Sequence, residues 1–204
     1  MPTYKLTYFD IRGRGELIRM LFVLSGKEYE DKRVQFADWP KLKPTLPGGS
    51  LPILEIDGKV YTQSLAIAQY LAKEFKLSGK TSLECLRVDE VVHTAEDMLQ
   101  AMAKSMFEKD ETKKKEMIEK LAKEDVPRFT KIFESFLTEN KTGFFVGNSI
   151  SAADLAVYNV LESAITKLGE AALKDSPKLL ENRKKVAADS KICNYLKKRK
   201  QTDM

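Results

Sequence analysis

The sequence lacks the long apolar runs that mark membrane proteins and exported precursors. Its longest stretch without a charged residue, Val60 to Ala72, has only 13 of the 204 residues, whereas a membrane-spanning helix needs about 20 apolar residues. The first residues include Lys5 and Asp10 in place of the apolar run of a secretory signal. We therefore expect no membrane span and a cytoplasmic protein.

Cysteine and histidine, the residues of disulfide frameworks and many metal sites, are also scarce. The two cysteines, Cys85 and Cys193, lie far apart and form no C-x-x-C motif, so neither a disulfide framework nor a zinc site is predicted. The single histidine, His93, shares one helix face with Asp89 and Asp97 at i, i+4, i+8 spacing. Such a face can hold an ion but is more often solvated or part of an interface, so we expect no metal.

A surplus of positive charge gives the chain a net charge of +5, which invites comparison with nucleic-acid-binding proteins. Most of the surplus lies in residues 183–200, where eight Lys and Arg accompany a single Asp. This segment matches no nucleic-acid-binding module. We expect it to form a solvated helix face, and we expect no nucleic-acid partner.

The N-terminal part of the chain alternates between strand and helix patterns. A β-rich run from Tyr4 to Phe9 predicts a strand, and apolar residues at helical spacing from Arg14 to Leu24 predict a helix that ends at Gly26. The elements expected next are a strand at 28–34, an irregular stretch with at most one helical turn, a hairpin at 52–62 with an Asp-Gly turn, and a helix capped by Ser64 that runs through Ala72. The order β-α-β-α-β-β-α is that of a thioredoxin-like domain.

Beyond a short polar linker the pattern is helical throughout. Helices are predicted from Leu83 to Glu108, from Lys113 to Glu139, from Ser151 with a capping box to Asp154, from Pro177, and from Ile192 to Lys198. The sequence thus predicts an α/β thioredoxin-like N-terminal domain at residues 1–78 and an all-α C-terminal domain at residues 79–204.

Tyr8 stands at the C-terminal end of the first predicted strand, where open α/β sheets place their ligand sites. The neighbouring run from Arg12 to Glu16 resembles half of a dinucleotide fingerprint, but Ile18 occupies the third glycine position, so nucleotide binding is rejected. Residues 9–12 carry no cysteine where a thioredoxin has two, which excludes dithiol redox chemistry.

Three further groups predict a pocket for a small peptide with anionic ends. A cis peptide bond at Leu51–Pro52 would leave the preceding backbone free to pair with an extended peptide. Gln63 and Ser64 start a helix whose exposed amides suit a carboxylate, although a plain helix cap is the alternative role for Ser64. Trp39 and Lys43 would present an indole N–H and an ammonium on the same side of one helical turn.

These residues belong to longer motifs that resemble a glutathione transferase of the sigma class. The matching segments cover essentially the whole chain and are Met1-Pro2, Tyr4 to Phe9, Arg12 to Arg14, Ala37 to Pro40, Leu51 to Leu54, Gln63 to Ala68, Gly147 to Ser149, Ser151 to Asp154 and the basic C-terminus. The segment from Ala37 to Pro40, together with Tyr8, favours the sigma class. The resemblance implies a homodimeric glutathione S-transferase that conjugates glutathione to electrophilic hydrophobic substrates in detoxification.

The resemblance also implies a role for each site residue. Tyr8, with Arg14 nearby, would be catalytic, because its hydroxyl would donate a hydrogen bond to the glutathione sulfur and favour the thiolate. The residues expected to bind glutathione, besides these two, are Trp39 and Lys43 at the glycine carboxylate, Leu51 and Pro52 at the cysteinyl backbone, Gln63 and Ser64 at the γ-glutamyl end, and Asp97 reaching across the dimer to the partner's ligand.

The sequence also predicts residues for the site of the electrophilic acceptor and leaves two alternative functions open. The acceptor site is expected to be lined by Ile11, Met98, Met102, Lys104, Met106 and Tyr158, and its flexible methionines suit a broad range of substrates. One alternative is a glutathione-dependent prostaglandin-H2 D-isomerase, but that branch has an acidic residue in place of His93 and an aromatic residue in place of Lys104. The other is a structural, lens-crystallin-like protein, whose relatives often carry an insertion where this chain has only residues 108–112.

Overall fold

A computed structural model of the chain describes residues 2–202, so Met1, Asp203 and Met204 of the predicted domain ranges lie outside the description. The N-terminal part forms a mixed four-stranded sheet in the order β2-β1-β3-β4. The strands are β1 (Tyr4–Phe9), β2 (Glu30–Val34), β3 (Ile53–Ile56) and β4 (Lys59–Thr62). β1 pairs in parallel with β2 and antiparallel with β3, and β3 and β4 form the predicted hairpin.

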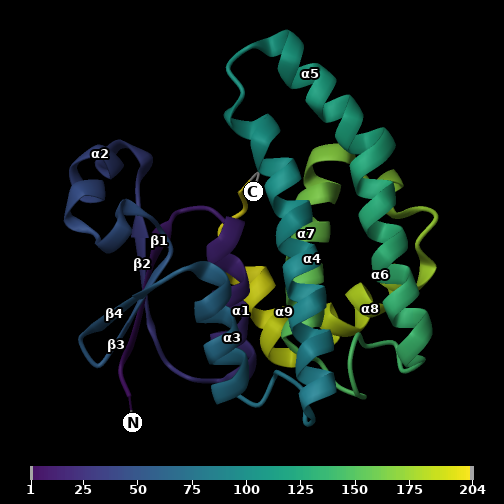
Figure 1. Cartoon of the computed structure of the whole chain (residues 1–204), viewed down its shortest axis with the longest axis horizontal. Helices are drawn as coiled ribbons and strands as arrows, with labels where there is room; N and C mark the ends of the chain where they lie inside the picture. The colour runs from purple at the N-terminus through teal and green to yellow at the C-terminus, as the bar shows by residue number, and fades with distance from the viewer. Residues whose placement is uncertain (1, 203–204) are drawn as a thin grey trace.

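Two helices separate this sheet from the rest of the molecule. α1 (Gly13–Ser25) and α3 (Ser64–Glu74) lie between the sheet and the helical part of the chain, while the single turn of α2 (Trp39–Leu42) lies away from it (Figure 1). α1 ends as predicted at Gly26, whose φ of 73° is left-handed and whose N–H donates to the carbonyls of two residues in the last turn. The sequence thus predicted the type and order of the main elements correctly.

Several local predictions differ from the structure. Ser64 is the first helical residue of α3 and not its cap, because the preceding Gln63 takes the N-cap position and no side chain caps the helix. The second strand begins at Glu30, two residues later than predicted. Short 3-10 turns at 36–38, 43–45 and 47–49 fill the stretch that was expected to be irregular.

The C-terminal part is helical, as predicted. Its helices are α4 (Ser82–Phe107), α5 (Glu111–Lys120), α6 (Val126–Asn140), α7 (Ala152–Leu168), α8 (Pro177–Ala188) and α9 (Ser190–Lys198), with a 3-10 turn at Glu170–Leu173. The helix predicted over 113–139 is interrupted by a π-helical segment, Leu121–Asp125. Pro127, two residues beyond this segment, has no N–H to donate to the preceding turn, which explains the wider local geometry. Within residues 2–202 no helix is both long and apolar enough to cross a membrane.

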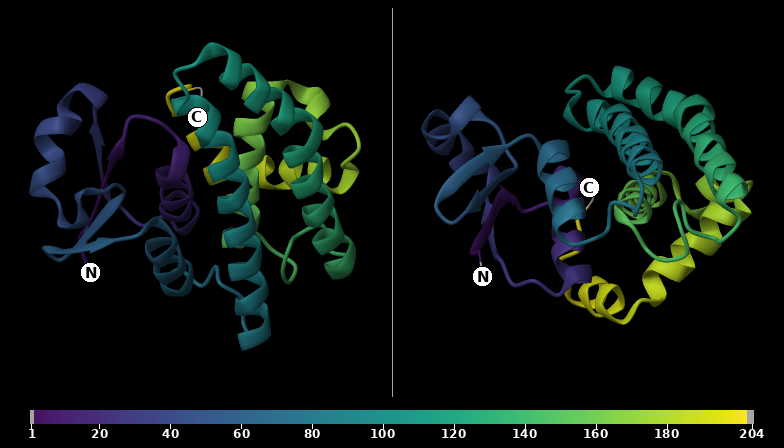
Figure 2. Two further views of the ribbon diagram at one scale, coloured as in Figure 1. Left: turned by 45° about the horizontal axis from the view of Figure 1, so that its top comes forward. Right: turned by 60° about the horizontal axis from the view of Figure 1, so that its bottom comes forward.

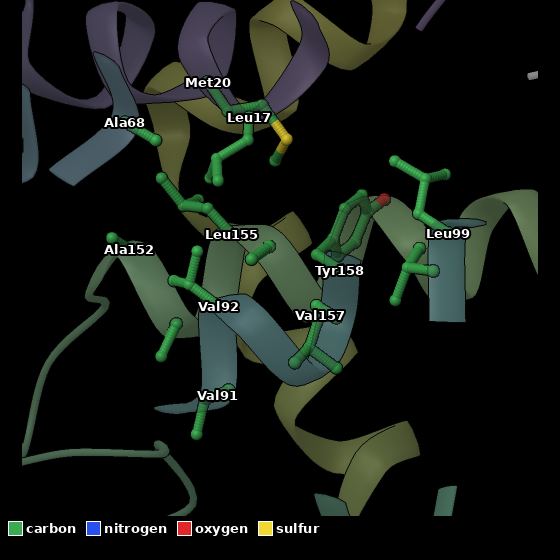
Figure 3. Close-up of a cluster of buried hydrophobic side chains, with 14 of the residues drawn as sticks. Leu17, Met20, Ala68, Val91, Val92, Leu99, Ala152, Leu155, Val157 and Tyr158 are labelled. Atoms are coloured by element: carbon green, nitrogen blue, oxygen red, sulfur yellow. The ribbon is translucent and has the colours of Figure 1, made fainter. Parts of the chain in front are cut away.

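α7 is the central helix of this part, with α4, α6 and α8 around it (Figure 2). It begins with the predicted capping box, in which the Asp154 carboxylate accepts hydrogen bonds from the backbone N–H and the hydroxyl of Ser151. Leu155 and Val157 of α7 pack with Val92 of α4 and Leu17 of α1 in one core (Figure 3). This core therefore joins the sheet-bearing part of the chain to the helical part.

A buried charge network ties the end of the chain to α1. The Glu16 carboxylate, whose side chain is 1% exposed, accepts hydrogen bonds from Arg19 at 3.3 Å and from Arg199 at 2.8 Å. The Tyr195 hydroxyl donates to the same carboxylate, and the Lys200 ammonium pairs with Asp10 in the loop after β1. The expectation of a solvated basic face is thus wrong for Arg199, because its charge is compensated inside the protein.

Glu16→Ala should destabilise the protein strongly, because it leaves two buried guanidinium groups with fewer counter-charges. Each arginine keeps another carboxylate, Asp31 for Arg19 and Glu162 for Arg199, so we expect a loss of about 3 kcal/mol, near the lower end for a broken buried ion pair. Urea unfolding monitored by circular dichroism measures this loss. Glu119→Ala, which removes an exposed partner of Lys123, should leave the unfolding midpoint unchanged; equal midpoints for both variants would contradict the prediction.

Candidate functional site

The ring of Tyr8 packs directly against the first turn of α1. Tyr8 is 6% exposed, and its ring lies where side chains at two glycine positions would stand. A Cβ atom on Gly13 would lie 2.7 Å from the Tyr8 hydroxyl oxygen, and one on Gly15 would lie 2.4 Å from a ring carbon. The two glycines of the Arg-Gly-Arg-Gly run therefore allow this close approach, which is the physical reason for a pattern that only superficially resembles a nucleotide fingerprint.

The Tyr8 hydroxyl is held as a hydrogen-bond donor. Its oxygen accepts a hydrogen bond from the backbone N–H of Arg14 at 3.1 Å. Burial raises the pKa of Tyr8 above its usual value of 10.0, an effect that the Arg14 hydrogen bond and the charges of Arg14 and Arg19 oppose. The hydroxyl thus keeps its proton at neutral pH, and the Arg14 N–H leaves that proton free to donate to another group.

Arg14 extends from this loop toward α4. Its Nε atom lies 2.6 Å from the carboxylate of Glu96, whose side chain is only 10% exposed, and Gln100 donates to the same oxygen at 3.3 Å. Neither Glu96 nor Gln100 was predicted from the sequence. Glu96 directly precedes Asp97, which was predicted to bind the ligand of a partner molecule, but only the fold shows that Glu96 is the carboxylate that contacts Arg14.

These residues form one wall of an open cleft of about 310 Å³. Its lining brings together residues that are distant in the sequence: Arg14, Ser50, Leu51, Pro52, Gln63, Ser64, Leu65, Glu96 and Gln100. The Leu51–Pro52 peptide bond is cis, as the sequence suggested. The structure therefore assembles five of the predicted residues, together with a buried carboxylate, around one cleft of ligand size.

Gln63 has a strained backbone at the polar end of this cleft. Its φ of 72° and ψ of 105° lie in a region that residues other than glycine rarely adopt. Such strain often occurs at functional sites, where the surrounding structure fixes an unusual backbone orientation. Here it places the side chain of Gln63 and the first amides of α3 beside Arg14 and Glu96.

Four of the predicted binding residues lie outside the lining of the cleft. One is Tyr8, which is buried against the first turn of α1 and contacts the N–H of Arg14; the other three are Trp39, Lys43 and Asp97. Trp39 is half-buried, with its ring 5.2 Å from that of Phe9 in an edge-to-face arrangement. Lys43 is exposed and its side chain passes over Gly49, next to the residues that precede the cis bond. Asp97 is exposed on the outer face of α4. A ligand in the cleft would have to extend beyond it to contact Trp39 and Lys43. It would contact Asp97 only if that residue came from a second copy of the protein.

The prediction of the acceptor lining requires correction. Met98, Met102 and Tyr158 are only 1%, 3% and 4% exposed, because they face inward between α4 and α7, so they offer no open wall to a substrate. Lys104 is exposed and Ile11 and Met106 are half-buried.

The structure shows a different set of residues between Arg14 and α7. They line a narrow crevice of about 30 Å³ and include Gly13, Leu99, Ala156, Asn159 and Val160. The α7 residues of this set carry no distinctive sequence pattern, because a helix that is buried on nearly all sides has no single apolar face.

The predicted face of Asp89, His93 and Asp97 has no metal-like geometry. His93 is exposed, and its Nε2 atom lies 3.2 Å from the Gln69 side-chain amide. Over the described part of the chain, no group of three or more His, Cys, Asp or Glu side chains could hold a metal ion.

Comparisons with known proteins agree with this fold and cleft. Residues 4–73 match the glutathione S-transferase N-terminal domain and residues 96–199 the glutathione S-transferase C-terminal domain. The chain is 41% identical to mouse hematopoietic prostaglandin D synthase over 100% of both chains, and 38% identical to S-crystallin SL11 of Nototodarus sloanii over 99% of both. The solved Fasciola hepatica sigma class glutathione S-transferase superimposes with a TM-score of 0.91 at 31% identity, over 100% of this chain and 99% of that chain.

These matches extend over both halves of the chain, which therefore belongs to the glutathione S-transferase family. Within that family, it is a sigma-class member. The resemblance inferred from the motifs of the sequence is confirmed.

The contact between Tyr8 and Gly15 should be visible as a coupling energy. Gly15 lies within α1 and does not have a positive φ, so its backbone is compatible with any residue. Without the Tyr8 ring, alanine would be favoured over glycine there by about 1 kcal/mol. Because the added Cβ collides with the Tyr8 ring, we expect Gly15→Ala to destabilise the protein by about 1–3 kcal/mol.

The same substitution should be neutral or stabilising in a Tyr8→Ala background, where the ring is gone. Urea unfolding of the four proteins of this double-mutant cycle gives the coupling energy. Additive effects of the two substitutions would contradict the contact.

Proposed function

We propose that the protein is a glutathione transferase that uses Tyr8 to hold the glutathione thiol as a thiolate and transfers this thiolate to electrophilic hydrophobic substrates. The observation that carries the proposal is the state of the Tyr8 hydroxyl, which is protonated and accepts a hydrogen bond from the N–H of Arg14, a residue that lines the cleft. A thiolate, and not the thiol, is the nucleophile.

The cleft suits an extended tripeptide with charged ends. The backbone of Leu51 before the cis bond would pair with the cysteinyl residue, and the first amides of α3 at Gln63 and Ser64 would hold the γ-glutamyl carboxylate. Glu96, which contacts Arg14 in the free protein, adds a carboxylate near the amine of that end. At the other end, Trp39 and Lys43 would receive the glycine carboxylate.

One hydrogen bond from Tyr8, with the charge of Arg14 nearby, is sufficient for thiol activation. A free thiol has a pKa near 8.5, and lowering it by about two units requires about 2.7 kcal/mol of preferential stabilisation of the thiolate. A hydrogen bond to a charged group contributes about 1.5–3 kcal/mol. In the transfer itself the sulfur forms a bond to the electrophilic carbon, and a leaving group such as halide departs with its electron pair, while the thiol proton has already gone to solvent.

An isomerase function is the second candidate, because the chain is similar to a hematopoietic prostaglandin D synthase over its full length. Both activities would use the same thiolate. We favour conjugation because His93 and Lys104 stand where the isomerase branch has an acidic and an aromatic residue. A purely structural, crystallin-like role is disfavoured because Arg14, Gln63, Ser64 and Glu96 gather polar groups around one cleft.

The proposal includes a homodimer in the cytoplasm, with domains at residues 1–78 and 79–204. Two exposed apolar patches support the dimer: a hairpin patch of Val60, Tyr61 and Tyr70, which are 40–48% exposed, and an α4 patch of Leu83 and Leu86, which are 77% and 63% exposed. The hairpin patch borders a hollow of about 250 Å³. In a twofold-symmetric pair, the hairpin patch of each molecule can cover the α4 patch of the other, so the same contact forms twice.

Tyr8→Phe should fold and bind glutathione but lose most of the thiolate. We expect the thiol pKa of bound glutathione to rise toward its free value and the conjugation rate with an aryl halide to fall by about 10- to 1000-fold, because one active-site donor is removed. The ultraviolet difference absorbance of the thiolate across pH, on wild type and variant, is the measurement.

The outcomes of this measurement separate the candidate functions. Binding without a thiolate shift in wild type would indicate a glutathione-binding structural protein, and no binding would contradict the proposed function. An unchanged rate in the variant would move the activating role to Arg14 or another group.

Tyr61→Glu should convert the dimer to a monomer, because it places a charge in the apolar hairpin patch. Phe107→Glu is the matched control, since Phe107 is equally apolar and 64% exposed but lies at the other end of α4. Sedimentation velocity of wild type and the two variants at equal concentration measures the oligomeric state. A monomeric wild type, or a dimeric Tyr61→Glu, would contradict this arrangement.

A further inference from the structure

One hydrogen bond from the helical domain reaches the first turn of α1, which carries the Tyr8 contact. Asn159 lies on α7, is 4% exposed, and its Nδ2–H donates to the backbone carbonyl of Gly13 at 3.2 Å. This bond joins residues 146 positions apart in the sequence. Gly13 is the first residue of α1 and has a left-handed φ of 39°.

The peptide group that Asn159 contacts is the same one that contacts Tyr8. The carbonyl of Gly13 and the N–H of Arg14 belong to one planar peptide unit, and that N–H donates to the Tyr8 hydroxyl at 3.1 Å. Asn159, the Gly13–Arg14 peptide and Tyr8 therefore form a continuous chain of hydrogen bonds, with each member donating to the next.

This peptide lies at the very start of α1, since Gly13 is the first residue of the helix. α1 starts without a side-chain cap, and glycine at position 13 allows backbone rotations that a residue with a Cβ would resist. A rotation of the peptide would turn the Arg14 N–H away from Tyr8. The Asn159 amide opposes that rotation from the other domain.

The stability of the helical domain alone does not explain why a polar amide is buried at position 159. Its Oδ1 atom is buried, and within the described residues no hydrogen-bond partner reaches it, although it borders the crevice next to Arg14. Burying an amide costs free energy unless both ends are satisfied. Among residues 2–202, the one hydrogen bond of this side chain is to the peptide that contacts Tyr8.

We propose that Asn159 is a positioning residue for thiol activation: it fixes and polarises the Gly13–Arg14 peptide, so that the Tyr8 hydroxyl donates more strongly to the glutathione sulfur. Chains of hydrogen bonds strengthen one another, because each donated bond makes the next donor more acidic. The inference rests on the proposed function, since it assigns a further residue, besides Tyr8 and Arg14, to the same thiolate.

The test compares the thiol pKa of bound glutathione in wild type, Asn159→Leu and Asn159→Ser. Leucine keeps the volume without a donor, and serine is a smaller variant that avoids overpacking if leucine does not fold. Ser163→Ala is the matched control, because Ser163 is 1% exposed, lies one turn further on α7 and donates to the carbonyl of Asn159.

We expect both Asn159 variants to raise the thiol pKa by about half a unit to one unit, equivalent to a three- to tenfold loss of thiolate at a pH well below the thiol pKa. The ratio kcat/KM should fall by the same factor at acidic pH, by less near neutral pH, and recover at alkaline pH, where the thiol ionises unaided. The affinity for glutathione and the Ser163→Ala profile should stay close to wild type.

Two results would overturn the inference. The first is a thiol pKa in the folded Asn159 variants equal to that of wild type. The second is a loss of activity that is the same at every pH, since a general structural defect would not recover with thiol ionisation. A wild-type protein that shows no thiolate shift would instead refute the proposed function, so the two failures are distinguishable.

Discussion

The close packing of the Tyr8 ring on the first turn of α1 is the contact on which the candidate site depends. It brings the hydroxyl within hydrogen-bond distance of the Arg14 N–H, and it is sterically allowed only because positions 13 and 15 have no Cβ atom. The same turn directs the Arg14 side chain to Glu96 on α4. The packing of the Tyr8 ring on Gly13 and Gly15 thus fixes the end of β1 against the start of α1, and Arg14 connects that turn to α4.

The rest of the fold supports this contact from both sides. Below the ring, α1 packs on α7 and α4 in a continuous apolar core (Figure 3), so the helix cannot move without disturbing the helical domain. Beside it, Arg19 lies 5.7 Å from the Tyr8 ring centroid and donates to Glu16, which also receives Arg199 from the end of the chain. The C-terminal basic residues therefore have a structural role near the site.

Regular alternation and strong turn signals explain why much of the fold could be predicted. The first strand, the hairpin at Asp57-Gly58 and the Gly26 helix end follow from local preferences, and the structure places Leu51, Pro52, Gln63, Ser64 and Arg14 around one cleft. Contacts between distant segments could not be predicted. The pattern of methionines on α4 fits a flexible pocket or a core equally well, and only the packing of α7 shows that Met98 and Met102 are core. Glu96 and Asn159 depend likewise on contacts across the domain boundary.

The environment of Tyr8 balances two opposing requirements. A donor to a thiolate must be acidic enough to share its proton strongly, yet it must not ionise, because two adjacent anions would repel each other. Burial favours the neutral phenol, while the Arg14 N–H and the nearby guanidinium charges make it more acidic. The Arg14 N–H acts from the first turn of α1. The orientation of the Gly13–Arg14 peptide therefore affects how strongly the buried phenol can share its proton.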